Sequence, residues 1–263
     1  MFGWFTKARR LRLTQNPFPP EWDKIIRSNV SYDALLDDDE RRRLRDMVRI
    51  FISEKNWEGC GGLELTDEMR VTISAMACIL ILNVKHNFYK NVETVIVYPT
   101  EVIPPQRRPG FFEVPLEPLD VPEPLSGEAF HQGPLILAWD TVLEAVDYPD
   151  SGYNVVYHEF AHKLDMQDGI ADGTPPLAGR NKYRDWVKTF SGEYLKLLDD
   201  IKKGRQTFLD PYGATDEAEF FAVATEHFFC QPVGMKNVMP ELYRVLKDFY
   251  HQTPAERTIN QST

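Results

Sequence analysis

The sequence predicts an α+β protein that is predominantly helical and carries a small mixed sheet. Helical periodicity covers most of the chain after residue 36, only two short segments favour strands, and no repeated strand–helix–strand alternation is visible. The 263 residues, 43% of them hydrophobic, can bury a large core, because a domain of this length removes roughly 70–75% of its unfolded surface from water. We expect one domain over residues 41–263, after an N-terminal extension, residues 1–40, that is partly irregular around its prolines.

Two segments in the first third of the chain predict long helices. Residues 37–40 are all acidic, which suits the first turn of a helix because of the helix dipole, and apolar residues follow at three- and four-residue spacing up to residue 55. Thr66 can cap a second helix that runs through the apolar stretch 75–82. Because this second helix is apolar on nearly every side, we expect it at the centre of the fold.

The middle of the chain predicts two strands separated by an ordered loop. Residues 94–98 are mostly β-branched, and residues 135–139 form a second short apolar run after a Gly-Pro pair. Between them, residues 99–124 hold eight prolines, too many for regular structure, together with apolar side chains that can anchor a loop. Helical patterns then return at four places in the second half of the chain: residues 153–167, 182–203, 216–230 and 239–251.

Charge and composition exclude several classes of partner. The formal net charge is −10, whereas a protein that neutralises nucleic-acid phosphates needs a basic surface, so we expect no nucleic-acid partner. The longest apolar run, residues 75–82, is far shorter than the roughly 20 residues of a membrane span, so none is predicted. Three widely spaced cysteines favour a reducing compartment, and the expected location is cytoplasmic.

The motif His158-Glu159-x-x-His162 predicts a metal site. Residues four apart lie on one face of a helix, so the two imidazoles can direct ring nitrogens to one zinc ion, and Glu159 lies close enough to take a proton from a metal-bound water. The flanking residues are largely apolar, and a buried helix carries two imidazoles and a carboxylate only when they have partners. The alternative is a pair of core histidines whose hydrogen bonds are satisfied within the fold.

A catalytic zinc needs a third protein ligand, and the residues alone leave four candidates. Asp168 has the right distance from the motif, but the preceding turn lacks the usual glycine, and His227 suits an ordinary core helix. Glu217 and Glu219 start a later helix and point to opposite sides, so only one of them can face the metal. Apolar neighbours favour Glu219, although Asp216 with Glu219 also forms a possible capping box.

Three segments together resemble the Mlc titration factor A family of bacterial zinc peptidases: QGPLILAWD (132–140), HEFAHKLD (158–165) and YGATDEAEFFAVATEHFF (212–229). The agreement runs from about residue 44 to residue 252, and the last segment is also similar to the catalytic domain of the anthrax lethal factor type of peptidase. The resemblance implies a zincin-like domain with a gluzincin-type site, in which Glu219 is the third zinc ligand and Tyr212 lies over the metal.

The resemblance also implies a function for the domain at 41–263. It implies one zinc ion per chain and aminopeptidase-like hydrolysis of peptide substrates, with Glu159 as the general base and Tyr212 as a possible donor to the developing oxyanion. It further implies association with Mlc, a glucose-responsive transcriptional repressor, and so a link to glucose uptake. The alternative function is a weakly catalytic or non-catalytic protein that sequesters this repressor.

Three local roles stay open at this point. Tyr212 could instead be a core aromatic residue whose hydroxyl is satisfied within the fold. The segment 135–138 could be an edge strand that aligns an extended peptide, or an interior strand. Asp165 could orient His162 or cap the end of its helix.

Overall fold

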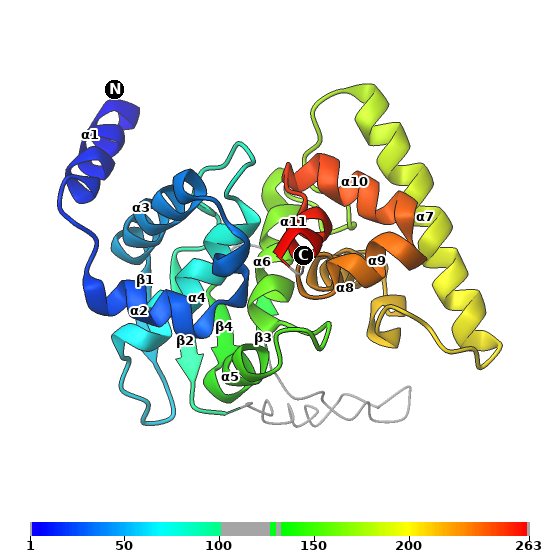
Figure 1. The fold of residues 1–263 in the computed structure, drawn as a ribbon, viewed down its shortest axis with the longest axis horizontal. Coiled ribbons are helices and arrows are strands. Elements are labelled where there is room, and N and C mark those ends of the chain that lie inside the picture. The colour runs from blue at the N-terminus through cyan, green and yellow to red at the C-terminus, as the bar shows by residue number, and fades with distance from the viewer. Residues whose placement is uncertain (1, 101–126, 130–132, 262–263) are drawn as a thin grey trace, which may run out of the picture.

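The computed structural model describes residues 2–100, 127–129 and 133–261, and within them the chain is mainly helical (Figure 1). The helices are α1 (Phe2–Thr14), α2 (Pro20–Asn29), α3 (Asp38–Glu54), α4 (Asp67–Leu80), α5 (Trp139–Asp147), α6 (Val155–Asp165), α7 (Arg180–Lys202), α8 (Glu217–Cys230), α9 (Pro232–Val238), α10 (Pro240–Tyr250) and α11 (Pro254–Gln261). Three short 3-10 segments are η1 (Ser31–Leu35), η2 (Met166–Asp168) and η3 (Pro211–Ala214).

The small sheet is mixed, as the sequence predicts. Its strands are β1 (Asn56–Gly59), β2 (Thr94–Tyr98), β3 (Gly127–Ala129) and β4 (Leu135–Ala138), in the spatial order β1-β2-β4-β3. The β1–β2 and β2–β4 pairs are parallel, and the β3–β4 pair is antiparallel. Since β4 lies between β2 and β3, it is an interior strand, and the edge-strand interpretation of residues 135–138 is wrong.

The two predicted early helices are confirmed as α3 and α4. At the start of α3, Asp37 accepts a hydrogen bond from the Glu40 amide while Glu40 accepts one from the Asp37 amide, which is a complete capping box. Thr66 caps α4 through the Met69 amide. Every residue of α4 from position 71 to 80 is buried, which confirms the central position expected for this helix.

Helix α6 lies at the centre of the molecule, between the N-terminal helices and the C-terminal helices (Figure 1). It packs against α4 on one side and α8 on another, and it also contacts β3 and β4. All eleven residues of α6 are buried, polar ones included. A polar motif on this helix is therefore an interior feature and not a solvated helix face.

The N-terminal extension contains more helix than the sequence suggests, because α1, α2 and η1 cover most of residues 1–40, and the non-helical stretch around its prolines is limited to residues 15–19. Helix α2 begins at Pro20, and proline suits this first helical position because the amide it lacks would have had no helical partner. Ile26 and Tyr32 lie in the same hydrophobic core as α6 and α8, and the Tyr32 hydroxyl donates to Gln252 Oε1 at 3.1 Å. The first forty residues thus contribute to the core.

Several elements differ from the prediction at their ends or were not predicted. Helix α5 begins directly after β4, so residue 139 is helical and not the end of a strand. Helices α9 and α11 and the strands β1 and β3 carry no clear signal in the sequence, because all are eight residues or shorter. Most of the predicted proline-rich loop, residues 101–124, lies outside the described residues. No helix in the described part of the chain has the length and apolar character needed to cross a membrane.

A partly buried ion pair links the C-terminal helix to the start of α3. The two terminal nitrogens of Arg257 donate to the two carboxylate oxygens of Glu40, each at 2.6 Å, and Asn83 donates to Glu40 as well. Burial would raise the pKa of Glu40, but these hydrogen bonds outweigh burial and lower it below the ordinary value. A lowered carboxyl pKa adds stability that is complete above the pKa of the unfolded chain, about 4.3, and is lost as pH falls through the folded value.

We therefore expect Glu40→Gln to reduce the free energy of unfolding at pH 7 by about 1–3 kcal/mol, since charged hydrogen bonds are lost. The wild-type chain should lose stability between pH 5 and pH 3 more steeply than the variant, which lacks the titrating group. Urea denaturation at a series of pH values measures both effects. Glu241→Gln is the matched control, because Glu241 forms an ion pair with Arg244 while remaining largely exposed. Equal slopes for wild type and Glu40→Gln would contradict the assignment.

Candidate metal centre

Helix α6 presents His158 and His162 on one face, one turn apart. The helix starts where the Asn154 side chain accepts a hydrogen bond from the Tyr157 amide at 3.0 Å, which fixes the first turn. The two Nε2 atoms lie 3.2 Å apart, and each histidine is only 8% exposed. Glu159, on the next position of the same helix, is also buried. The structure therefore brings together the three residues of the motif in the interior.

Glu219 reaches the two histidines from the first turn of α8. Its Oε2 atom lies 2.9 Å from His158 Nε2 and 3.4 Å from His162 Nε2. The Glu219 amide donates to the Asp216 carboxylate, so Asp216 caps α8, while the Glu219 carboxylate lies against the imidazoles. His158, His162 and Glu219 form a group that could hold a metal ion, since their ligand atoms all lie within 4.8 Å of one another.

A second carboxylate, Glu226, orients His158 from behind. Glu226 Oε1 lies 2.8 Å from His158 Nδ1, and Glu226 Oε2 accepts a hydrogen bond from the Asn154 amide at 2.6 Å. One side chain on α8 thus holds both the start of α6 and the ring of a candidate ligand. Sequence reasoning missed Glu226. The available signal was its position two turns after Glu219, on the same face of a helix whose residues between the two, 220–224, are all apolar.

We expect Glu226→Gln to weaken metal affinity about 10–100-fold, the usual effect of losing a carboxylate that orients a ligating histidine. The amide can still accept from His158 Nδ1, but its nitrogen cannot accept from the Asn154 amide. Competition with a chelating indicator dye measures the affinity. Glu217→Gln is the control, because Glu217 is exposed on the same helix, and an equal loss in both variants would contradict the role given to Glu226.

The donor atoms of this cluster fit a metal ion. A carboxylate next to His158 Nδ1 places the proton on that nitrogen, so in the neutral ring Nε2 carries a lone pair. This lone pair faces Glu219 Oε2, a buried oxygen that accepts no hydrogen bond among the described residues. Atoms bound tetrahedrally at 2.0–2.2 Å from a metal lie roughly 3.3 Å from one another. The observed separations of 2.9, 3.2 and 3.4 Å match that spacing.

The electrostatics of the cluster also favour a positive centre. Burial would raise the pKa of Glu219, but the close approach of the two imidazoles to its carboxylate outweighs burial and lowers the pKa to about 2. Burial would lower the pKa of His158, yet the carboxylates Glu219 and Glu226 raise it well above the ordinary value. Both shifts mean that the cluster binds positive charge strongly, whether as protons or as a cation.

Glu159 has the environment of a proton acceptor. Burial raises the pKa of its carboxyl group, and the neighbouring histidines only partly offset this effect. Its Oε2 atom is buried and has no hydrogen-bond partner among the described residues. A carboxylate with an elevated pKa and an unused oxygen beside a metal-binding group suits general acid–base chemistry.

The other three candidates for a third ligand lie elsewhere. Asp168 is exposed at the end of η2, where its side chain accepts from the Ile170 amide. His227 is a core residue, because its Nδ1 atom contacts the Val223 carbonyl oxygen at 3.0 Å and its ring packs against Phe208. Glu217 is exposed at the first position of α8. None of the three belongs to the metal-binding group found among the described residues.

Tyr212 lies beside the cluster. It is the second residue of η3, where the Asp210 carboxylate accepts a hydrogen bond from its amide at 2.8 Å. Its ring centroid is 6.0 Å from that of His158, and the residue is 43% exposed. This exposure excludes the interpretation of Tyr212 as an ordinary core aromatic. It places a phenol on the solvent side of the histidines.

Asp165 anchors the loop that follows α6. It is fully buried, and its Oδ2 atom accepts a hydrogen bond from the Gly173 amide at 2.9 Å. Burial raises the pKa of Asp165 to about 6, although this hydrogen bond opposes the rise. The Gly173 carbonyl oxygen accepts from Trp186 Nε1 at 3.1 Å, and the Gly173 Cα atom faces the Glu217 carbonyl group. Gly173 therefore lies where the end of α6 and the start of α8 meet.

We expect Gly173→Ala to destabilise the fold and to disturb the position of Glu219. A Cβ atom there would lie 2.2 Å from the Glu217 carbonyl oxygen, and the backbone φ of +72° also disfavours any side chain. Gly179→Ala separates the two effects, because it shares a positive φ, +95°, but has open space around its Cβ position. Thermal denaturation should show the larger fall in melting temperature for Gly173→Ala. Equal falls would contradict the packing argument.

Comparison with known proteins identifies relatives along most of the chain. The family model described as glucose-regulated metallo-peptidase M90 matches residues 4–251, so the match includes the N-terminal helices and begins well before the expected residue 44. An uncharacterized protein of Synechocystis sp. is 38% identical over 248 residues, covering 94% of this chain and 89% of the relative. Mlc titration factor A of Serratia proteamaculans is 32% identical, with 84% of each chain covered. The Yersinia enterocolitica protein of that name is 27% identical, covering 98% of this chain and 93% of its own.

Proposed function

This chain belongs to the family of glucose-regulated metallo-peptidases M90, and on that premise we propose that it hydrolyses peptide bonds at a zinc ion held by His158, His162 and Glu219. The observation that carries the proposal is the convergence of three buried acceptor atoms from α6 and α8, with the unpaired carboxylate oxygen of Glu159 on the same helix. Two imidazoles and one carboxylate are a common ligand set of catalytic zinc, which keeps a fourth position open.

Each side chain around the proposed zinc ion has a distinct role in the reaction. A zinc ion bound here supplies Lewis acidity and lowers the pKa of a bound water to about 7. Glu159 takes the proton of the attacking water and returns it to the leaving amine. The Tyr212 hydroxyl donates to the oxygen on which negative charge develops, a contribution worth on the order of 10²–10³ in rate where such donors have been removed. Glu226 and Asn154 hold His158 and the start of α6 while the proton moves.

The sheet offers a place for an extended peptide. In the described part of the chain, β3 is one of the two outer strands of the sheet, and it contacts α6, the helix that carries the histidines. An extended substrate can add to such an outer strand through main-chain hydrogen bonds. We therefore assign the alignment of an extended peptide to β3 and not to residues 135–138. We assign short peptides as substrates, with aminopeptidase-like cleavage.

The second candidate function is binding of a transcriptional repressor. The relatives from Serratia and Yersinia carry the name Mlc titration factor A, which points to an interaction with Mlc for those proteins. A protein that acts only by sequestering a partner has no need for a general base. The buried and unpaired carboxylate of Glu159 therefore favours catalysis as the main activity.

Metal content and peptide hydrolysis measured on one preparation test the proposal. Elemental analysis of the purified full-length chain should give one zinc per chain. A screen of aminoacyl substrates and internally quenched peptides should show turnover that stops on chelation and returns with zinc. Zinc at full occupancy without turnover of any peptide would favour the binding function, and absence of any bound divalent metal would overturn both the ligand set and the mechanism.

A further inference from the structure

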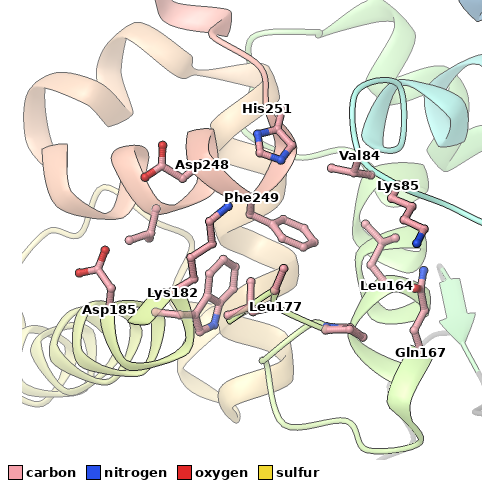
Figure 2. Close-up of a pocket in the computed structure, with 14 residues that line it drawn as sticks. Val84, Lys85, Leu164, Gln167, Leu177, Lys182, Asp185, Asp248, Phe249 and His251 are labelled. Carbon is pink, nitrogen blue, oxygen red and sulfur yellow. The ribbon is translucent and has the colours of Figure 1, made fainter. Parts of the chain in front are cut away.

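A cavity lies on the far side of α6 from the metal-binding group. Its volume is about 190 Å³, and it opens between the end of α6, the start of α7 and the end of α10 (Figure 2). Leu164 of α6 lines it. Leu164 follows His162 by two residues, which places it roughly 200° around the helix from that ligand. The lining includes no member of the metal-binding group, so the cavity is a separate feature.

The inner wall of this cavity is apolar and partly aromatic. The wall is formed in part by Leu164, Trp186, Val245 and Phe249. Trp186 is held in place by its hydrogen bond to the Gly173 carbonyl oxygen and by stacking on Phe190, with the two ring centroids 4.0 Å apart. Such a wall cannot satisfy the hydroxyl groups of a polar ligand, and burying unpaired polar groups is costly. The wall therefore favours an apolar ligand body.

Positively charged and imidazole groups reach the mouth of the cavity from three segments. Lys85 follows α4, Lys182 lies in the first turn of α7, and His251 follows α10. Figure 2 shows the two lysines on opposite sides of the cavity. Neither ammonium group has a hydrogen-bond or ion-pair partner among the described residues. The two nearby acids, Asp185 and Asp248, contact Arg244 at 2.8 and 3.5 Å, and neither forms an ion pair with these lysines.

His251 also lies at this mouth, at the end of α10. Its backbone is left-handed, with φ of +51°, at the position after a helix where glycine is the usual residue. A side chain at such a position costs conformational free energy that glycine would avoid. The chain nevertheless places an imidazole there, beside the apolar wall and the two unpaired lysines.

We propose that this cavity binds a small aromatic carboxylate, with its ring against Trp186 and Phe249 and its carboxylate at the lysines. The volume of the cavity suits a small aromatic carboxylate. An apolar cavity of about 150 Å³ accepts a benzene ring, and the additional space here admits a short carboxylate arm. Charge agrees as well, since ammonium–carboxylate hydrogen bonds are the strong kind. The proposal is independent of the chemistry at the metal-binding group.

Ligand-observed NMR with phenylacetate and the full-length chain tests the proposal. We expect saturable binding with a Kd in the millimolar range or tighter, as suits a ligand of about ten heavy atoms. Lys182→Met and Lys85→Met should each weaken binding roughly threefold to tenfold. Benzyl alcohol, which has the ring without the charge, should bind more weakly than phenylacetate.

Two further variants make the result decisive. Ala178→Phe places a ring in the cavity from an exposed lining position, so it should abolish binding while the chain stays folded by circular dichroism. Lys202→Met removes an exposed lysine at the far end of the same helix, about 30 Å away, and should leave binding unchanged. The proposal would be overturned if Lys202→Met weakened phenylacetate binding as much as the cavity lysine variants do, or if Ala178→Phe bound phenylacetate as well as the wild-type chain. It would also be overturned if a hexose phosphate bound more tightly than phenylacetate.

Discussion

Glu159→Gln is expected to keep the metal and lose hydrolysis. The amide has nearly the same shape as the carboxylate but cannot accept a proton from water and pass it to the leaving amine, so kcat should fall by a factor of about 10²–10⁴. Glu159 contributes no atom to the metal-binding group, so elemental analysis should give the same metal content as for the wild-type chain. Because Glu159 Oε2 has no hydrogen-bond partner among the described residues, the substitution leaves no donor unpaired there and should not unfold the chain.

The control for this variant is Glu217→Gln, which neutralises an exposed carboxylate near the same site and should keep full activity. If Glu159→Gln turns over peptide substrates at the wild-type rate, the assigned proton transfer is wrong and repressor binding becomes the leading function. If it loses metal as well as activity, Glu159 holds the site together and is not solely a base.

The parts of the site that lie on one helix were predictable from the sequence. The positions of His158, Glu159 and His162 follow from helical periodicity alone, and the apolar residues around them indicate that the helix is buried. The cap at Asn154 and the end of α6 at Asp165 are likewise local features. Local geometry needs no knowledge of the remaining fold, and for that reason this part of the prediction agrees with the structure.

The third candidate ligand depends on how two helices pack, which the sequence does not specify. Four residues remained possible on spacing alone, and the structure brings only Glu219 to the histidines, because α8 packs directly on α6. Glu226 was missed for a related reason. From the sequence alone, an acid in the second half of a helix rich in phenylalanine could be an exposed residue or a partner for a distant one. Only the fold shows that its partners are His158 and Asn154.

The errors in the fold concern short elements and pairing order. Strand β4 has the same apolar pattern whether it lies at an edge or in the interior, and its place was decided by β3, a three-residue strand without a sequence signal. The N-terminal helices were missed because prolines near residue 17 suggested irregular chain. Proline starts α2 at a position that tolerates it, and Ile26 of that helix is fully buried.

Glu219→Ala is expected to remove most of the bound metal. It takes away the only candidate ligand supplied by α8, and two imidazoles on α6 would remain to hold the ion. Losing a direct ligand should cost more affinity than losing a residue that orients one, so the loss should exceed about 100-fold and exceed that of Glu226→Gln. Elemental analysis after dialysis against a weak chelator measures the retained metal.

The structure makes this test specific to the metal. Glu219 Oε2 accepts no hydrogen bond among the described residues, so its removal leaves no buried donor unpaired, and the cap of α8 depends on the side chain of Asp216 and not on that of Glu219. The variant should therefore keep the native fold by circular dichroism, with some loss of stability because the contacts of Glu219 with the two imidazoles also stabilise the metal-free chain, while Glu217→Ala should keep its metal. Full metal occupancy in Glu219→Ala would mean that another oxygen completes the site, and Asp168, near the end of α6, would then be the first residue to substitute.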